Sequence, residues 1–454
     1  HRTGPICFEP FEPRMLMSAD LVPVGTQPEG SLSGKTVYVH AGHGWEFNGS
    51  TWGTQRPETF EMVEDFGNID QMNFLVDYLW NAGATVVPLR PAGHQLNEVV
   101  LDNDDAEVTF VGNWSNSSSG IFYGTAGDVP YRFAGTNPTE TAYARYRPDI
   151  PEAGHYPVYA WTRAGSDRVE QLYRVHHAAG VTEVTVNHRQ VGNGWVYLGE
   201  YYLEEGTDAY VDISNRSDDP NGSVVIADAI RFGNGVGDSG FAREDESTLY
   251  WVQEQLGVGS TGTVGGVVSA SVRHAARMNR AADGDLSDRV FVSFHSNAGS
   301  GSNRGVLGLY NGNNNPATET PNQFLLAETI ARQVNDDLVA LNGQFEHNWF
   351  DRGSSLTLDR GDIEFGEINN LYVNNEFDAT IIETGFHDNQ LDAELMRDPK
   401  VRDAIARATY QGIVEYFNAV DGGATSLQNL PAPVTDLRVS DFLGGVGQLQ
   451  WSVP

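Results

Sequence analysis

The chain has 454 residues, more than one hydrophobic core usually covers, so two or three domains are expected. Its 61 acidic residues outnumber the 28 basic ones, and the formal net charge of −33 argues against binding to nucleic acid or anionic membranes. No apolar run approaches the roughly 20 residues that a membrane span needs, and the single cysteine, Cys7, excludes an intramolecular disulfide and a zinc site of cysteine pairs.

The elements predicted first along the chain are those of an α/β domain. Residues 36–40 and 84–89 are short apolar runs rich in β-branched side chains and are predicted to be strands. Between them apolar residues recur at spacings of three and four, which predicts a helix with one face packed on the sheet. That face comprises Phe66, Ile69, Met72, Leu75, Val76, Leu79 and Trp80.

A different pattern extends from about residue 101 to residue 235. Short, alternating, aromatic-rich segments are separated by Gly, Asn and Asp turns, and helical periodicity almost disappears. Such a block of about 130 residues is typical of a β-sandwich. The predicted strands include residues 142–146, 155–161, 195–203 and 224–232.

Helix-and-strand alternation then returns, with strands predicted at 290–294, 305–310 and 379–382 and helices over 326–341 and 401–416. Because α/β elements flank an all-β block, the simplest organisation is one catalytic domain interrupted by a sandwich inserted in a surface loop. The fold class is therefore α/β, with a mostly parallel sheet flanked by helices and an inserted all-β sandwich.

The domain organisation expected from these patterns has five parts. They are an N-terminal extension (1–34), the first part of the α/β domain (35–100), the inserted sandwich (101–235), the second part of the α/β domain (236–420) and a linker with a further module (421–454).

Three residues at the junctions of the α/β elements are candidate zinc ligands. His43 follows the first strand, Glu64 opens the first helix and His295 ends a later strand. Ligands in open α/β sheets gather outside the carboxyl ends of the strands, so these side chains are expected to face one cleft. A His-Glu-His set leaves a fourth position for the water that zinc (Zn2+) makes nucleophilic. Glu383, at a strand end beside a glycine, is the candidate acid/base for the leaving nitrogen.

Each of these residues also has a simpler interpretation. A histidine beside a glycine turn is more often a structural hydrogen-bonding residue. Glu64 early in a helix would favour the helix dipole, and Glu383 would fit a buried ion pair. The four residues taken together favour a hydrolytic zinc site.

At these positions the chain resembles the zinc-dependent N-acetylmuramoyl-L-alanine amidases of the amidase 3 type. The resemblance covers about residues 35–100 and 236–420, and it implies zinc binding by His43, Glu64 and His295 and catalysis by Glu383. It also implies cleavage of the amide that joins N-acetylmuramic acid to L-alanine of the peptidoglycan stem peptide. The segments that carry it are Val39-His-Ala-Gly-His-Gly44, Glu64-Asp-Phe-Gly-Asn-Ile69, Phe291-Val-Ser-Phe-His-Ser-Asn-Ala298 and Ile381-Ile-Glu-Thr-Gly-Phe-His-Asp-Asn389.

Three residues depart from that family pattern. His40 stands where an aspartate is usual, Ala41 replaces a proline and Trp45 replaces a second glycine. Because a carboxylate normally orients a ligating imidazole, His40 indicates either a changed pH profile or another orienting partner for His43.

Two further points stay open in the sequence. Glu61 is close enough to Glu64 to compete as the ligand, although the spacing to Asn68 favours Glu64. Residues 342–375, rich in Asp, Glu and Asn, form either a lid over the cleft or a solvated loop.

The inserted block resembles the golvesin-type β-sandwich of secreted bacterial proteins, which implies attachment to or recognition of surface polymers such as polysaccharide. Trp114, Trp161 and Trp195 either stack on sugar rings or, as is more usual in a sandwich, belong to its core. His176 and His177 point to opposite faces of a strand, so at most one can serve a given metal site, and a core or surface position is favoured. The segments that carry the resemblance are residues 101–107, 173–180 and 226–232.

Residues 430–454 resemble the first strands of a fibronectin type III module. The first residue, His1, is neither methionine nor part of an apolar leader, which fits a processed or trimmed product. The resemblance to peptidoglycan amidases implies a secreted protein, extracellular or in the periplasm and cell envelope.

The sequence predicts a zinc-dependent hydrolase whose partner is peptidoglycan, with no nucleic-acid partner and no membrane span. Two alternatives stay open: a zinc amidase or peptidase acting on another polymer, and a non-catalytic surface protein that binds glycan. Because all four site positions hold chemically competent residues, the hydrolase is favoured.

Overall fold

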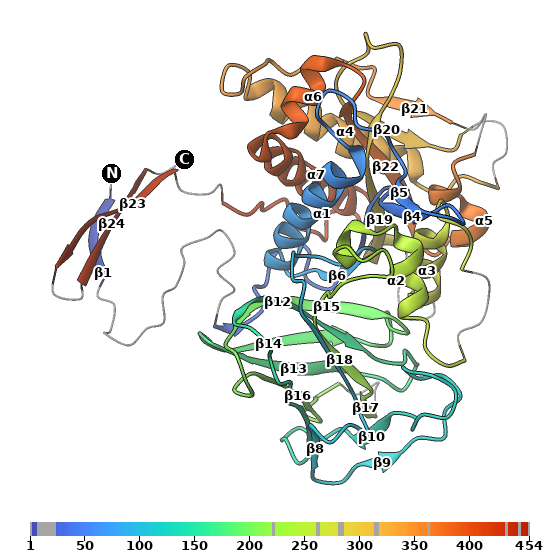
Figure 1. The fold of residues 1–454 in the computed structure, drawn as a ribbon, viewed down its shortest axis with the longest axis vertical. Coiled ribbons are helices and arrows are strands. Elements are labelled where there is room, and N and C mark those ends of the chain that lie inside the picture. The colour runs from blue at the N-terminus through green and yellow to red at the C-terminus, as the bar shows by residue number, and fades with distance from the viewer. Residues whose placement is uncertain are drawn as a thin grey trace.

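The computed structural model places an α/β unit in the upper part of Figure 1 and an all-β unit below it. The α/β class and the inserted all-β sandwich predicted from the sequence are confirmed. Cys7 lies outside the residues that the structure describes. These are residues 2–6, 24–219, 223–259, 264–279, 286–312, 317–360, 364–431, 435–443 and 446–452.

The α/β unit is built on a six-stranded sheet of order β21-β20-β22-β19-β3-β6. From β22 through β19 and β3 to β6 the neighbouring strands run parallel, whereas β20 pairs antiparallel with β22. Every residue of β22 is buried, as expected for an inner strand covered on both faces. The strands are β3 (Thr36–Ala41), β6 (Thr85–Pro88), β19 (Arg289–Asn297), β20 (Leu307–Tyr310), β21 (Thr357–Asp359) and β22 (Asp378–Phe386).

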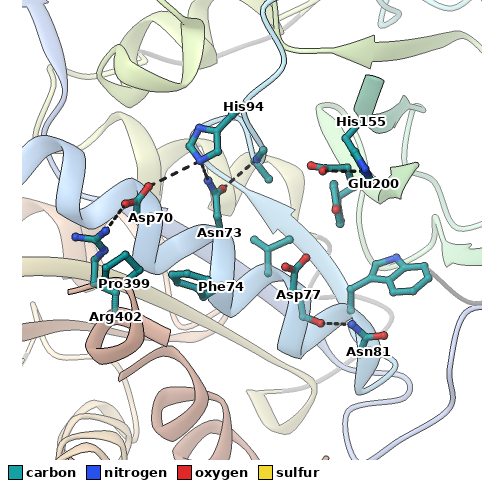
Figure 2. A pocket seen from close by; sticks show the side chains of 15 residues that line it. Asp70, Asn73, Phe74, Asp77, Asn81, His94, His155, Glu200, Pro399 and Arg402 are labelled. Carbon is teal, nitrogen blue, oxygen red and sulfur yellow. Dashed lines mark hydrogen bonds and ion pairs between the residues drawn. The ribbon is translucent and has the colours of Figure 1, made fainter. Parts of the chain in front are cut away.

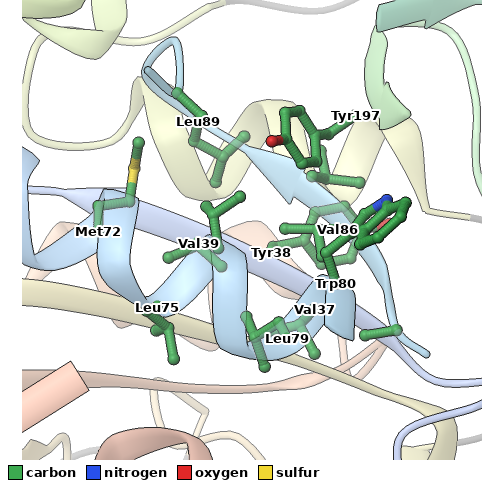
Figure 3. Packing of buried hydrophobic residues seen from close by; sticks show 14 of the residues in the cluster. Val37, Tyr38, Val39, Met72, Leu75, Leu79, Trp80, Val86, Leu89 and Tyr197 are labelled. Carbon is green, nitrogen blue, oxygen red and sulfur yellow. The ribbon is translucent and has the colours of Figure 1, made fainter. Parts of the chain in front are cut away.

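Three long helices pack together against this sheet: α1 (Glu64–Asn81), α4 (Gln323–Ala340) and α7 (Pro399–Val420). Figure 3 shows Val37 and Val39 of β3 in the buried cluster with Leu75 and Leu79 of α1. The shorter helices are α2 (Thr248–Glu254), α3 (Ala270–Met278), α5 (Asn370–Val373) and α6 (Gln390–Arg397), with 3₁₀ turns η1 (Arg243–Asp245), η3 (Leu286–Asp288) and η4 (Gly366–Ile368).

The prediction for one residue of the apolar helix face is wrong. Phe66 was expected to pack on the sheet, but it is 36% exposed. Leu75 lies nine positions after Phe66, which corresponds to about two and a half helical turns, so the two side chains point to opposite sides of α1.

The inserted unit forms three antiparallel arrays of strands, apart from one short parallel pairing with β2 (Gly25–Thr26). The sheet orders are β2-β14-β13-β16-β11-β8, β15-β12-β18-β7 and β17-β10-β9. The strands are β7 (Glu98–Asp102), β8 (Val108–Val111), β9 (Ser115–Asn116), β10 (Arg132–Gly135), β11 (Tyr143–Tyr146), β12 (Gly154–Trp161), β13 (Glu170–His177), β14 (Gly180–Asn187), β15 (Trp195–Leu203), β16 (Tyr210–Ser214), β17 (Val224–Ala227) and β18 (Ala229–Gly233).

The single strand predicted over 224–232 is two strands that belong to different sheets. β17 pairs with β10, and β18 pairs with β12 and β7. The break falls at Asp228, which is fully buried and whose carboxylate accepts a hydrogen bond from the Tyr123 amide at 3.2 Å. A continuous apolar pattern does not reveal such a change of sheet, because both strands remain buried.

Two smaller sheets complete the described part of the chain. β4 (Trp45–Phe47) and β5 (Trp52–Thr54) form a hairpin after β3. β23 (Thr435–Leu443) and β24 (Val446–Ser452) form a second hairpin, to which β1 (Arg2–Ile6) adds antiparallel. Among the described residues, no helix has both the length and the apolar character required to cross a membrane.

Candidate metal centre

The three predicted zinc ligands come together at the carboxyl ends of two neighbouring strands. His43 follows β3, His295 lies near the end of β19 and Glu64 begins α1. His43 Nε2 lies 3.3 Å from Glu64 Oε1, and His295 Nδ1 lies 3.4 Å from the same oxygen. The two imidazole nitrogens are 3.2 Å apart. The three side chains are only 13%, 2% and 12% exposed, so an ion held between them would be largely shielded from bulk water.

These separations fit a tetrahedral zinc ion. Nitrogen and carboxylate ligands lie about 2.0–2.2 Å from zinc, which places neighbouring ligand atoms on a tetrahedron about 3.3–3.5 Å apart. The observed distances of 3.2, 3.3 and 3.4 Å therefore require little rearrangement. Three protein ligands leave the fourth position of a tetrahedron for water or substrate, as in catalytic zinc sites.

A short Gly-His-Gly turn presents the first histidine. His43 has a φ of 68°, in the left-handed region that non-glycine residues seldom adopt. Gly42 is required by space, because a Cβ there would lie 2.1 Å from the His295 ring. Asn68 Nδ2 of α1 donates to the Gly42 carbonyl at 3.0 Å. His43 Nδ1 lies 3.3 Å from Gln55 Oε1, which makes Nδ1 the donor and leaves Nε2 facing the cluster.

Two buried charged residues fasten this turn. Asp65 Oδ1 accepts from the backbone amides of Gly44 and Gln55 at 2.9 and 2.8 Å. Arg90 is fully buried and satisfies its guanidinium on backbone oxygens, so the position of His43 depends on the interior of the domain. Arg90 donates to the carbonyls of Ala41, Gly42, Asp65 and Glu244.

Glu64 enters the cluster as an anion. Burial alone would raise its pKa, but the adjacent His295 and His43 rings hold the pKa of Glu64 well below its usual range. Its Oε1 also accepts from the Ser296 amide at 2.9 Å. The competing Glu61 has an 84% exposed side chain and lies outside this group of residues.

Glu383 lies beside the cluster on the next strand. It pairs directly with His295 across β19 and β22, and paired residues on neighbouring strands point to the same face. The residue is 9% exposed, and its Oε2 has no hydrogen-bond partner among the described residues. Burial raises the pKa of Glu383 to about 8; His295 opposes this shift, and Glu64 and Glu367 add to it. A carboxyl group with such a pKa can hold and release a proton near neutrality.

Glu367 is a member of the site that the sequence did not reveal. It lies in η4, within the region 342–375 for which the sequence allows two roles, and its side chain is 7% exposed. Its Oε2 lies 3.0 Å from His295 Nε2, and its Oε1 lies 2.6 Å from His40 Nδ1. The alternating polar residues His40 and Ser293, paired across β3 and β19, indicated a polar face, but no local pattern placed a carboxylate opposite them.

A separate cavity of 390 Å³ lies where α1 and α7 meet the inserted unit. Figure 2 shows Asp70 paired with Arg402 at 2.9 Å on one side and His155 near Glu200 at 3.7 Å on the other. None of the three candidate zinc ligands, His43, Glu64 and His295, lines this cavity. The cavity is therefore separate from the candidate metal centre.

The tryptophan residues noted in the insertion are wholly or partly buried, and its two noted histidines belong to no group spaced for metal binding among the described residues. Trp161 and Trp195 are fully buried, which confirms their assignment to the core, and Trp114 is partly buried. Within the described part of the chain, the groups of residues spaced for metal binding include neither His176 nor His177.

Two family models match the chain. Residues 267–415 match the family described as N-acetylmuramoyl-L-alanine amidase, and residues 99–234 match the Golvesin C-terminal domain. The first match contains His295 and Glu383 but begins after His43 and Glu64, so the inclusion of the latter two in the candidate site rests on their distances alone. Neither match reaches residues 421–454, and the fibronectin type III start stays a prediction.

Solved structures with partial similarity include enzymes of the same name. The CwlD amidase of Clostridioides difficile in complex with the GerS lipoprotein has 20% identity, a TM-score of 0.23 and coverage of 33% of this chain and 61% of that chain. The amidase Ami1 of Mycobacterium smegmatis has 20% identity, a TM-score of 0.25 and coverage of 41% and 82%.

A Paenibacillus xanthan lyase has 28% identity and a TM-score of 0.28, and the similarity covers 31% of this chain and 13% of the lyase. This chain thus spans less than two thirds of the lyase and of the C. difficile amidase. No curated protein matches it. Because these TM-scores are low, the similarity to amidases and to the Golvesin C-terminal domain rests on the two family models.

Proposed function

We propose that this chain, whose residues 267–415 belong to the N-acetylmuramoyl-L-alanine amidase family, is a zinc-dependent hydrolase that cleaves the amide between N-acetylmuramic acid and L-alanine in peptidoglycan. The observation that carries the proposal is the convergence of His43, Glu64 and His295, with ligand atoms 3.2–3.4 Å apart, beside the buried Glu383. The family match supports amide hydrolysis as the reaction class, and the spacing of the three candidate ligands supports a bound zinc ion.

The chain's own residues divide the work of amide hydrolysis. Zinc bound by His43, Glu64 and His295 would supply a water of lowered pKa and polarise the substrate carbonyl. The anionic Glu64 would balance part of the metal charge, and the Gln55 contact leaves Nε2 of His43 available to bind the ion.

Glu383 performs the proton transfers in this proposal. Its carboxylate takes the proton that the attacking water loses and delivers it to the amide nitrogen, which leaves as a neutral amine. The raised pKa of about 8 describes the side chain without a metal, and a nearby cation lowers the pKa of a carboxyl group. Glu383 would then be an effective base at neutral pH and an effective acid once protonated.

The substrate also sets the expected location of the protein. Peptidoglycan lies outside the cytoplasm, and we infer that the protein acts in the extracellular space or cell envelope. The Golvesin-type insertion, residues 99–234, is proposed to hold a surface polysaccharide while the α/β unit acts on the wall.

Digestion of purified peptidoglycan tests the proposed reaction. The full chain would be compared in zinc-loaded, chelated and zinc-restored form, with mass spectrometry detecting stem peptides that begin with L-alanine. Glu383→Ala should lower peptide release at least about 100-fold. Glu328→Ala, on the exposed surface of α4 beside Arg332, is the matched control and should retain full activity.

Other products would redirect the assignment. Peptides cut internally would indicate a zinc peptidase in place of an amidase. Absence of release by zinc-loaded protein on several peptidoglycan types would contradict hydrolysis and favour the surface-binding alternative.

A further inference from the structure

Three donors converge on one buried carboxylate behind the metal cluster. His295 Nε2 lies 3.0 Å from Glu367 Oε2, His40 Nδ1 lies 2.6 Å from Oε1, and the Ser293 hydroxyl also bonds Oε1. An ionised carboxylate only accepts hydrogen bonds, so both imidazoles must donate to it. When the His295 ring is neutral, as it must be to bind a metal, this donation leaves Nδ1 unprotonated, and Nδ1 is the atom that faces His43 and Glu64.

We propose that Glu367 is a positioning residue that fixes His295 in the tautomer with Nε2 protonated and so presents Nδ1 to the metal, while His40 and Ser293 hold Glu367 in place. This inference rests on the proposed zinc function of the same site. It assigns a role to His40, the residue that stands where the amidase pattern has an aspartate.

The backbone supports this arrangement. His40 and Ser293 are register partners in the parallel pair β3 and β19, and His295 is two residues beyond Ser293 on the same face. All three side chains therefore project toward the position that Glu367 occupies. A carboxylate at this position meets three donors from two rigid strands, which is the condition for orienting a metal ligand.

The turn that carries Glu367 is itself anchored. Asn311 bonds both the amide and the carbonyl of Phe365, at 3.0 and 3.2 Å. Gln323 Nε2 of α4 donates to the Ile368 carbonyl at 2.9 Å, and Ile368 is fully buried. The residues on both sides of Glu367 are thus bonded to the interior, so the carboxylate is held in place and does not belong to a solvated loop.

An alternative use of these atoms is a second metal between His40, His295 and Glu367, whose ligand atoms also lie within 4.8 Å of one another. That site would require His295 to lose both ring protons if it also served the first metal. Ser293 and His40 already donate to Glu367 Oε1, and His40 Nε2 is buried without a partner among the described residues. The hydrogen-bonded tautomer satisfies these donors, and the second metal does not.

Zinc affinity of the full chain tests the proposal directly. Glu367→Gln retains the size of the side chain but offers one acceptor oxygen to three donors. We expect zinc affinity, measured by competition with a chromophoric chelator, to fall about 10- to 100-fold. The visible spectrum of the cobalt-substituted protein should also change, because the geometry at His295 is altered.

Glu376→Gln is the matched control. Glu376 is a half-buried glutamate just before β22, and its Oε2 accepts a hydrogen bond from Asn279 Nδ2 at 2.9 Å, outside the group of His40, His43, Glu64, His295 and Glu367. Its substitution should leave zinc affinity and the cobalt spectrum unchanged. An affinity and a spectrum of folded Glu367→Gln that match the wild type would overturn the inference while leaving the zinc hydrolase intact.

A measurement on the wild-type protein tests the same inference without requiring that a variant folds. Nitrogen-15 NMR of zinc-loaded, histidine-labelled protein should show His295 bound through Nδ1 and protonated at Nε2. Binding through Nε2 would refute the role of Glu367. If the wild type binds no zinc at all, the proposed function fails together with this inference.

Discussion

Gly42→Ala is the substitution for which the structure gives the sharpest prediction. The new Cβ would lie 2.1 Å from His295 Cε1, 2.2 Å from Nε2 and 2.6 Å from Nδ1. Carbon atoms in contact lie about 3.5 Å apart, so the ring and the turn must separate by about 1.4 Å. Gly42 is not among the residues with positive φ, and the backbone itself therefore tolerates alanine.

A displacement of this size is large for a metal site. Ligand distances are held to within about 0.2 Å, so His295 and His43 can no longer reach one ion together. We expect zinc affinity to fall at least about 100-fold, more than outer residues typically contribute. Amidase activity should fall with it at zinc concentrations that saturate the wild type.

The assay is chelator competition on the purified 454-residue chain, followed by thermal unfolding with and without zinc. Gly53→Ala is the control, because Gly53 lies in the neighbouring β5 and a Cβ there would meet no other part of the chain within 4 Å. A Gly42→Ala protein that binds zinc as tightly as the wild type would refute the assignment of His295 as a ligand.

Two further predictions concern stability. Free zinc at 100 times its dissociation constant should raise the free energy of unfolding by about 2.7 kcal/mol, and equal stability with and without chelator would contradict a site present only in the folded chain. Burial lowers the pKa of His188 to about 4, against about 6.5 when unfolded, so the unfolded state binds the proton first as pH falls. Between pH 7 and pH 5 this should cost about 2 kcal/mol, and urea unfolding of His188→Gln should show a loss smaller by that amount. An unchanged pH dependence in the variant would show that His188 is not the group responsible.

The positions of the proposed ligands could be predicted because each one lies where a local pattern changes. A β-branched run ends before Gly42 and His43, a helical periodicity begins at Glu64, and an apolar strand leads to His295. In a parallel sheet such ends meet at one edge, so local signals were enough to bring distant residues together.

The surroundings of the ligands could not be predicted in the same way. Glu367 is 72 residues beyond His295 and reaches it through an irregular segment whose path depends on tertiary packing. Gln55, the partner of His43, likewise lies in a loop fixed by Asp65. Neither position carries a periodic pattern, and a glutamate or glutamine in a polar loop is usually solvated.

The inserted unit need not disturb the candidate metal centre, because the two ends of the insertion lie next to each other. Gly233 at the end of β18 pairs with Glu98 at the start of β7, and Asn234 Nδ2 donates to the Ala92 carbonyl at 2.9 Å. Insertions are tolerated where the entering and leaving strands are adjacent, since the host then needs no rearrangement. The junction is also connected to the candidate site through Arg90, which precedes the insertion. Its guanidinium donates to the carbonyl of Glu244, which follows the insertion, and to the carbonyl of Gly42, which precedes His43. A ligand that moved the insertion relative to the sheet would therefore act on the turn that carries His43, and loss of the Arg90 guanidinium would disconnect the two.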